Sequence, residues 1–180
     1  MSPKDYVAGL KRAKQRIIDE LPAISEEIAV STLSIVKDMA IEEGIIIDGV
    51  PGSHQSYSSK LINTSLFAGK ELNKGGESYI SANEKGNWAG FRKAQGLSDG
   101  NVNLAYTMRM WTGIQVLRTN QVGLGRMETI IGAADQETRD KIEANVNRYV
   151  GNFFDPTPEQ KQMADEIAKE RLNQIIQSET

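Results

Sequence analysis

Few side chains in this sequence are suited to catalysis, and they are scattered. His54 is the only histidine and there is no cysteine, which excludes thiolate nucleophiles, disulfides and a transition-metal site of the ordinary kind. A hydrolase with a Ser/His/Asp triad built on His54 is the only testable form of enzyme. A lone histidine in a loop is more often a surface residue, so we expect no catalytic residue and no enzymatic activity.

Short motifs for cofactors and metals are each incomplete. Ser34 and Lys37 have the Ser-x-x-Lys spacing, but no S-D-N or K-T-G sequence accompanies them. The run GLGRME, which starts at Gly123, has Glu128 where a dinucleotide-binding loop has its third glycine. Asp48 precedes a glycine, but the residues after it lack the alternating oxygen ligands of a calcium loop. We therefore expect no cofactor and no bound metal.

Composition describes one globular domain spanning residues 1–180. The 180 residues are 39% hydrophobic and 25% charged, which is enough for a hydrophobic core. The formal net charge of -3 means that the whole molecule does not attract DNA or anionic membranes. No secretory signal and no apolar run of membrane-spanning length is found, so we expect synthesis in a cytosol and no membrane partner.

Helical periodicity at the start of the chain predicts a long N-terminal helix. Apolar residues recur at helical spacing over residues 4–21 and again over 24–40. Pro22 lacks an amide hydrogen, so a kink or a new helix start is expected there. Gly44 supplies a C-terminal stop.

Two amphipathic helices are predicted at the C-terminal end. Residues 135–150 repeat their apolar side chains at helical spacing, and so do residues 157–178. The second of these begins with a capping box, with Thr157 as the N-cap and Gln160 three residues later.

The residues between these helices predict a small, mostly antiparallel sheet. Alternation over residues 102–106 is typical of a half-buried strand. The runs GIQVLRTN (113–120) and RMETIIGA (126–133) flank a glycine-bearing connection and predict a hairpin. The predicted fold class is therefore α+β, with helices at both ends of the chain around the sheet.

Residues 44–100 are the unusual part of the chain and predict a long irregular arm. They hold ten of the sixteen glycines, and helical or strand periodicity almost vanishes, so a packed layer of their own is not expected. Their aromatic residues argue against disorder. They indicate an arm whose anchors are buried either against the parent fold or against a neighbour. The interface candidates are Tyr57, Phe67, Tyr79, Trp88, Phe91 and Arg92.

The two tryptophans are expected to differ in their surroundings. Trp88 and Phe91 would share one face of a short helix bounded by Gly86 and Gly96, and we expect Trp88 to anchor against a neighbouring subunit or partner. Trp111 follows a predicted strand and is expected in the domain core.

Charge is unevenly distributed. Residues 1–18 carry five basic side chains and one acid, whereas residues 19–48 carry eight acids and Lys37. This pattern is typical of a solvated helix surface, and it would also suit head-to-tail attraction between copies in an oligomer. Residues 50–109 have a small excess of three positive charges, which is compatible with loose, non-specific DNA contact in a pore and does not indicate sequence reading.

Two adjoining segments resemble the head–tail connector and tail-completion (neck) proteins of tailed bacteriophages. The first is W-x-G-F-R-x-x-Q-G at residues 88–96, and the second is VNLAYTMRMWTG at residues 102–113. The runs FAGKELNKGGESYI (67–80) and PTPEQKQMADEIAKERLNQII (156–176) resemble connector proteins from phages of gut Bacteroidetes. The order of elements is also similar. One position departs from the family pattern: many relatives have glycine directly after the strand-ending threonine, whereas Met108 follows Thr107 here, so a remodelled turn is expected.

The resemblance implies a virion structural protein that forms an oligomeric ring between the portal or adaptor and the tail. It implies assembly in the host cytoplasm and an arm that is ordered by the adjacent subunit. A DNA-packaging adaptor belongs to the same broad class. The alternative from a different class is a cytosolic protein-binding module that uses the loop region 44–113.

Overall fold

The computed structural model has an α+β architecture and describes residues 2–63, 67, 72–105, 108–123 and 125–180. Along the chain the elements are α1 (Pro3–Glu42), β1 (Ile62–Asn63), α2 (Lys74–Ala82), β2 (Lys85–Gly86), α3 (Trp88–Ala94), α4 (Arg109–Gly113), β3 (Ile114–Gly123), β4 (Arg126–Ala133), α5 (Gln136–Tyr149) and α6 (Pro158–Glu179). The strands form two antiparallel two-stranded sheets. The predicted fold class is confirmed. Among the described residues, no helix is both long and apolar enough to cross a bilayer.

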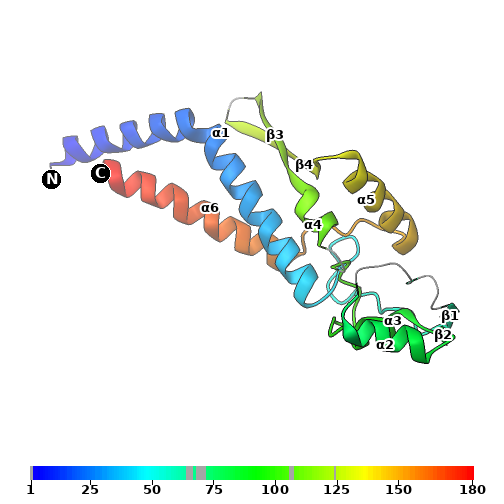
Figure 1. Cartoon of the computed structure of the whole chain (residues 1–180). Helices are drawn as coiled ribbons and strands as arrows, with labels where there is room; N and C mark the ends of the chain where they lie inside the picture. Colours follow the sequence, from blue (N-terminus) through cyan, green and yellow to red (C-terminus); the bar gives the residue numbers. More distant parts are fainter. Residues whose placement is uncertain (1, 64–66, 68–71, 106–107, 124) are drawn as a thin grey trace.

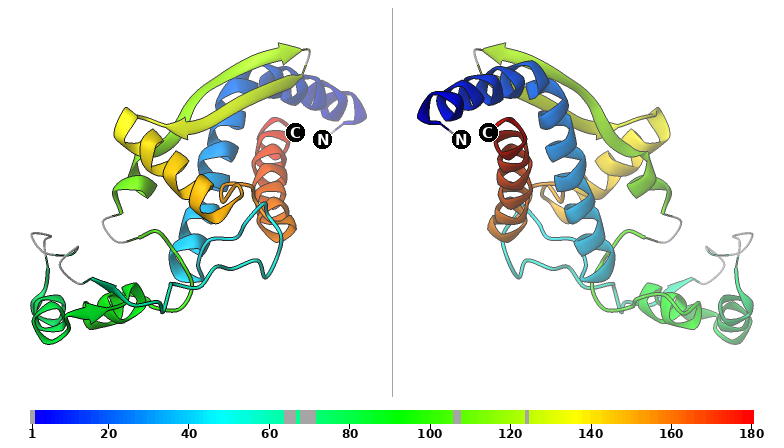
Figure 2. Two further views of the ribbon diagram at one scale, coloured as in Figure 1. Left: turned by 90° about the vertical axis from the view of Figure 1, so that its right-hand side faces the viewer. Right: turned by 90° about the vertical axis from the view of Figure 1, so that its left-hand side faces the viewer.

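Two parts are distinguished in Figures 1 and 2. The body contains α1, α4, the β3–β4 hairpin, α5 and α6, and the arm module contains β1, α2, β2 and α3 together with Phe67. The arm module projects from the end of the body where α1 terminates, and its two helices pack on each other.

Helix α1 begins with a capping box and continues without interruption for 40 residues, or about 60 Å. The Ser2 hydroxyl accepts a hydrogen bond from the Asp5 amide, and the Asp5 carboxylate accepts one from the Ser2 amide. Pro22 lies inside the helix and does not start a new one. Figure 1 shows that α1 bends about midway along its length, which agrees with the predicted kink.

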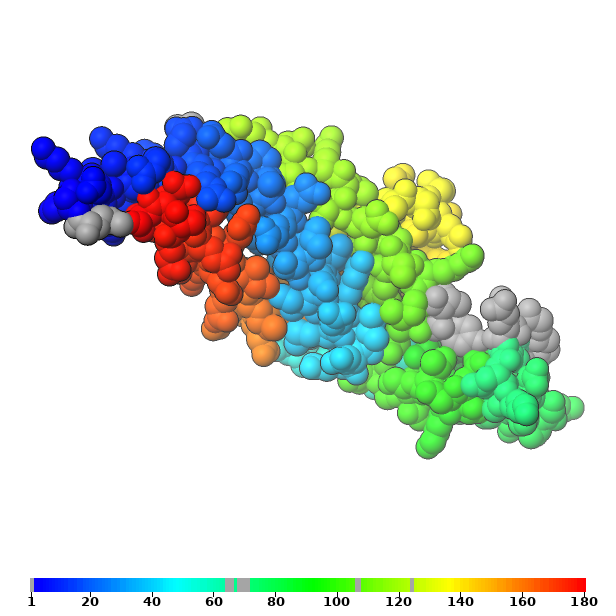
Figure 3. Space-filling model, turned by 60° about the vertical axis from the view of Figure 1, so that its left-hand side comes forward, coloured from blue at the N-terminus to red at the C-terminus, as the bar shows by residue number. Residues whose placement is uncertain are grey.

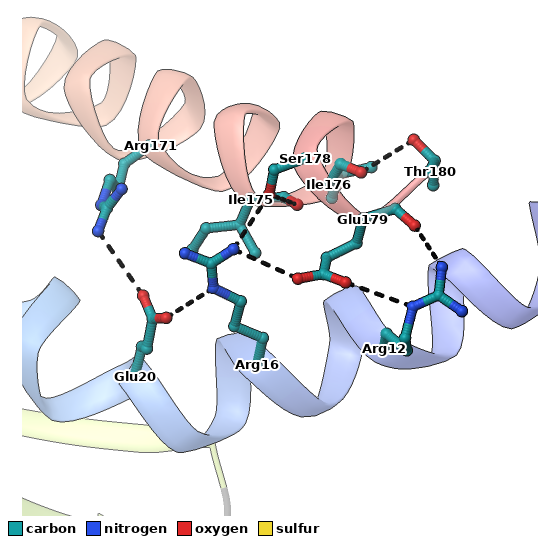
Figure 4. Close-up of polar contacts among 9 residues, drawn as sticks. All are labelled: Arg12, Arg16, Glu20, Arg171, Ile175, Ile176, Ser178, Glu179 and Thr180. Atoms are coloured by element: carbon teal, nitrogen blue, oxygen red, sulfur yellow. Dashed lines mark hydrogen bonds and ion pairs between the residues drawn. The ribbon is translucent and has the colours of Figure 1, made fainter.

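Helix α6 runs antiparallel beside α1, from Met39 next to the start of α6 to Gly9 next to its end, so that both termini lie at the same end of the molecule (Figure 1). Its start at the Thr157–Gln160 capping box confirms the prediction. Gly9 permits the close approach, because a Cβ atom there would lie 2.5 Å from the carbonyl oxygen of Glu179. Arg12 donates a hydrogen bond of 2.9 Å to that same carbonyl oxygen, and Arg16 donates one of 3.3 Å to the Glu179 carboxylate (Figure 4).

The predicted hairpin is confirmed and lies against α1. Strands β3 and β4 pair from Ile114 opposite Ala133 to Gly123 opposite Arg126, with two irregularities in the register. A chain of hydroxyl groups fixes the hairpin on the helix: Ser25 of α1 and Thr129 of β4 are 3.2 Å apart, and Thr129 and Thr119 are 3.1 Å apart. Helix α5 follows the hairpin, which confirms the helix predicted over residues 135–150, and its N-cap residue is Asp135.

The core of the body gathers residues from distant parts of the chain. It contains Leu33, Ala40, Ile45, Ile47, Val102, Met110, Trp111, Ile114 and Phe153. Trp111 is 1% exposed and meets Phe153 and Phe154 edge-on. Its predicted place in the core is confirmed. Ile45 and Ile47 belong to this core too, so the predicted arm boundary at residue 44 is wrong and the projecting part begins later.

The strand predicted over residues 102–106 is wrong. Val102 and Asn103 are both buried, which breaks the expected alternation, and Leu104 has a left-handed φ of 54° that an extended strand does not allow. The segment instead makes single backbone contacts: the Ile45 amide donates to the Val102 carbonyl, and the Val102 amide donates to the Gln55 carbonyl. Tyr106 and Thr107 lie outside the described residues.

Candidate functional site

The arm module is built from two short helices that fit together through glycines. Asn73 caps α2 and Asn87 caps α3, and each side-chain oxygen accepts from the amide three residues later. A Cβ atom on Gly75 would overlap with the carbonyl group of Ala94, so the two helices can approach this closely only because Gly75 has no side chain. The arm therefore has regular structure of its own, where only a short helix between Gly86 and Gly96 was predicted.

An aromatic cluster fills the space inside this module. The rings of Phe67 and Phe91 stack with centroids 4.0 Å apart, and Trp88 lies 5.2 Å from Phe67 and 5.7 Å from Phe91. Tyr79 completes the cluster at 6.2 Å from Phe91. Phe91 and Phe67 are buried, whereas Trp88 and Tyr79 remain partly exposed. The expectation that this region has no packed layer of its own is wrong.

The Tyr79 hydroxyl also ties α2 to the start of α3. It accepts a hydrogen bond of 3.0 Å from the Asn87 amide. Gly86 and Gly90 flank this hydroxyl, and a Cβ atom at either position would lie within 2.6 Å of it. The glycines that appeared to indicate an irregular loop are therefore positions where a ring passes close to the backbone.

A buried arginine joins the arm module to the body. The guanidinium carbon of Arg92 lies 4.4 Å from the centroid of the Tyr57 ring, a cation–π contact. Arg92 donates a 2.6 Å hydrogen bond to the Ser98 carbonyl and a 3.0 Å hydrogen bond to the Asn103 side-chain oxygen. The Tyr57 hydroxyl donates to this Asn103 oxygen as well, at 2.9 Å.

Asn103 extends these contacts into the core. Its amide nitrogen donates a 3.0 Å hydrogen bond to the Ile41 carbonyl near the end of α1. Its backbone carbonyl accepts a 2.8 Å hydrogen bond from the indole nitrogen of Trp111. Asn103 is 5% exposed and thus links the arm module, α1 and the core tryptophan in one network. We call Tyr57, Arg92 and Asn103 the arm root.

A cleft of about 190 Å³ opens beside the arm root. It is lined by Tyr57, Trp88, Arg92, Leu104, Met110, Lys141, Asn145, Arg148 and Tyr149. Helix α5 supplies the basic side chains Lys141 and Arg148, and burial raises the pKa of the Tyr149 hydroxyl. With aromatic rings and cations but no nucleophile–base pair, this cleft is suited to recognition.

A second hollow, of about 390 Å³, lies within the body between α1, the base of the hairpin and α5. Its lining is mainly apolar and includes Leu33, Ile114, Ile142 and Phe154, with Arg139 as its charged member. These side chains offer shape and apolar surface, and no pair of groups suited to proton transfer.

The six interface candidates lie together in the structure. Tyr57 and Arg92 belong to the arm root, and the other four form the aromatic cluster. Phe67, Phe91 and Arg92 are buried within their own chain, so they stabilise the arm module and do not present a surface to a partner. Tyr57, Tyr79 and Trp88 keep exposed area, and Trp88 lines the cleft. Sequence reasoning missed Asn103, which carried no local signal.

The residues considered for chemistry are separated from one another. The Lys37 ammonium donates a 2.7 Å hydrogen bond to the Ile114 carbonyl, and burial lowers its pKa; the Ser34 hydroxyl donates instead to Asp38. His54 is half-buried, and its Nδ1 atom has no hydrogen-bond partner within the described part of the chain. No group of three or more His, Asp or Glu side chains suited to a metal occurs among the residues that the structure describes.

No protein-family model, no curated protein and no solved structure matches the chain.

Proposed function

We propose that this protein is a virion structural protein that forms a homo-oligomeric ring at the head–tail junction of a tailed bacteriophage. In this role it links the portal or an adaptor to the tail, as a neck, connector or tail-completion protein. The proposal starts from the resemblance of residues 88–96 and 102–113 to that family.

The observation that carries the proposal is the construction of the arm module. It projects from the body (Figure 2), yet it keeps a defined shape through its own aromatic cluster and a hydrogen-bonded root. A projecting module with partly exposed Trp88 and Tyr79 is suited to contact with a neighbouring subunit, since aromatic residues are enriched in interface cores.

The proposed partners follow from this role. They are further copies of the chain, the portal or adaptor, and tail proteins, with non-specific contact to DNA in the channel. The protein would then be located in the virion and, during assembly, in the host cytoplasm.

The test is the mass of the purified chain by light scattering over a range of concentrations, followed by electron microscopy of any assembly. We expect closed rings with a central channel. A chain that stays monomeric at its highest soluble concentration would favour the protein-binding module instead. Rings that bind portal but not tail proteins would favour the DNA-packaging adaptor.

A further inference from the structure

The N-terminal segment of α1, residues 3–18, exposes an apolar stripe. Tyr6, Val7, Leu10 and Ile18 are between 38% and 51% exposed. At 3.6 residues per turn these four side chains lie within about 120° of the helix circumference. The buried residues of this segment are Gly9 and Ala13. Gly9 faces the end of α6, on another side of the helix.

Farther along α1, the same stripe is covered. Ile18 and Ser25 are seven residues apart and therefore lie on the same face, and Ser25 contacts Thr129 of the hairpin. Figure 1 shows α1 continuing toward its N-terminus beyond the hairpin. The apolar face thus has a partner in the second half of the helix and none within the described chain in the first half.

Basic side chains border the uncovered part. Lys4, Lys11 and Lys14 are exposed, and none makes an ion pair within the described residues. Arg12 and Arg16 differ, because both bind Glu179 of α6 (Figure 4). A partner for this surface should combine apolar area with negative charge.

The opposite end of the same body has that character. Glu42 and Glu43 lie at the C-terminal end of α1, and Glu159 lies in the first turn of α6. The two helix ends adjoin, because Gln160 donates to the sulfur of Met39. Met163, one turn after Glu159, is 42% exposed and adds apolar area. Figure 3 shows the N-terminal part of α1 at one end of the α1–α6 pair, and the C-terminal end of α1 beside the start of α6 at the other.

The acids at the end of α1 oppose the dipole of their own helix. Negative side chains near a helix C-terminus are destabilising, and the last turn of α1 has no basic residue to compensate. A cation supplied from outside would therefore be bound favourably here.

We propose that residues 3–18 of one copy dock on the acidic end of the next copy, where Glu42, Glu43 and Glu159 receive Lys4, Lys11 and Lys14. This inference rests on the ring proposed above and specifies its subunit contact. Such a head-to-tail contact joins two different surfaces, and repetition of it generates a closed ring when the rotation between copies closes.

The experiment reverses charge on each side of the contact and measures mass by light scattering. One variant carries Lys11→Glu and Lys14→Glu, a second carries Glu42→Lys and Glu43→Lys, and a third combines all four. We expect the first two to be monomeric where the wild type is a ring. The third should recover at least half of the assembled mass, because the reversed charges on the two surfaces are again opposite in sign. Circular dichroism checks the helix content of each.

The matched control is Arg118→Glu with Arg126→Glu, which makes the same change in net charge on exposed residues of the β3–β4 hairpin, away from the arm module and from both proposed contact surfaces. It should leave the ring intact. A ring that survives both reversed pairs, or that the control disrupts equally, overturns this contact while leaving the proposed function standing. A wild-type chain that never assembles overturns both. A variant with Val7→Ser and Leu10→Ser should also assemble less than the wild type, and full assembly would count against the stripe.

Discussion

Trp111 in the body is surrounded by residues far from it in the sequence, whereas Trp88 in the arm module is surrounded by residues closer to it in the sequence. Trp111 is packed among side chains from α1, the 102–103 segment and Phe153, and its indole nitrogen is hydrogen-bonded. Trp88 contacts Phe67 and Phe91. The body therefore depends on contacts between distant segments, whereas the arm module depends on local ones that close over a short loop.

The difference indicates two levels of stability in one chain. A cluster closed by local contacts keeps its shape when the surrounding protein is perturbed, but it buries less apolar surface. Asn103 is the residue through which the two parts are coupled, since it binds Arg92 on one side and Ile41 on the other. Variants at these positions test whether the two parts are stabilised separately.

The largest effect is expected for Trp111→Ala. Removal of a buried tryptophan usually lowers the free energy of unfolding by about 3–5 kcal/mol, because a cavity remains. Calorimetry should show a large drop in the melting temperature of the whole chain. Trp88→Ala is the matched variant: its side chain is partly exposed, so the body transition should move little. Equal losses for both variants would mean that the arm module and the body unfold as one unit.

The second-largest loss of stability is expected for Asn103→Ala. It removes the hydrogen-bond partner of the Tyr57 hydroxyl, of the Arg92 guanidinium and of the Ile41 carbonyl. Buried polar groups left without partners cost about 1–3 kcal/mol each, so a total loss of about 2–3 kcal/mol is expected after partial rearrangement. Limited proteolysis should then cut near the arm root.

Asn101→Ala is the control for this prediction, because the Asn101 side chain donates a hydrogen bond to the Glu43 carbonyl in an exposed position. If Asn101→Ala and Asn103→Ala are cut at the same rate, Asn103 does not couple the arm module to the body.

Gly75→Ala tests the fit between α2 and α3. Alanine is better than glycine in a helix by about 1 kcal/mol, so the change would be stabilising if the helices were not in contact. The new Cβ would overlap with the Ala94 carbonyl group, and overpacking of this kind costs about 1–3 kcal/mol. Hydrogen exchange should become faster in α2 and α3 only. Gly100→Ala should have no such effect, because a Cβ atom at Gly100 would meet no atom within 4 Å apart from its neighbours along the chain.

The smallest effect is expected for Met108→Gly. Unlike the other variants, it should raise the free energy of unfolding. Met108 has a φ of 58°, in the left-handed region that favours glycine. Relief of this strain, less the entropy that glycine loses on folding, should raise the free energy of unfolding by about 0.5 kcal/mol. A lower stability in chemical denaturation would show that the methionine side chain compensates for the strain.

Helix ends and hairpin turns were predictable because their signals are local. The Thr157–Gln160 capping box and the glycine-bearing turn of the hairpin each act over a few residues, and both lie where they were expected. The strand over 102–106 was wrong because Leu104 adopts a left-handed conformation that alternation does not reveal.

The arm was harder to predict because its signals are ambiguous. Gly75 and Gly76 indicate a loop in a single sequence, although here they let two helices approach. Asn103 could not be identified, because its side chain bonds to residues 46 and 62 positions away.

The central claim is that the arm module keeps its own fold and completes its contacts against a neighbouring copy. Hydrogen exchange measured by mass spectrometry, at concentrations below and above assembly, tests it most directly. We predict that the amides of α3 exchange about tenfold more slowly in the assembly, a change of 1.4 kcal/mol, while those of α1 around the core residues Leu33 and Val36 exchange at the same rate in both states. Identical exchange of α3 in the monomer and the assembly would contradict the claim.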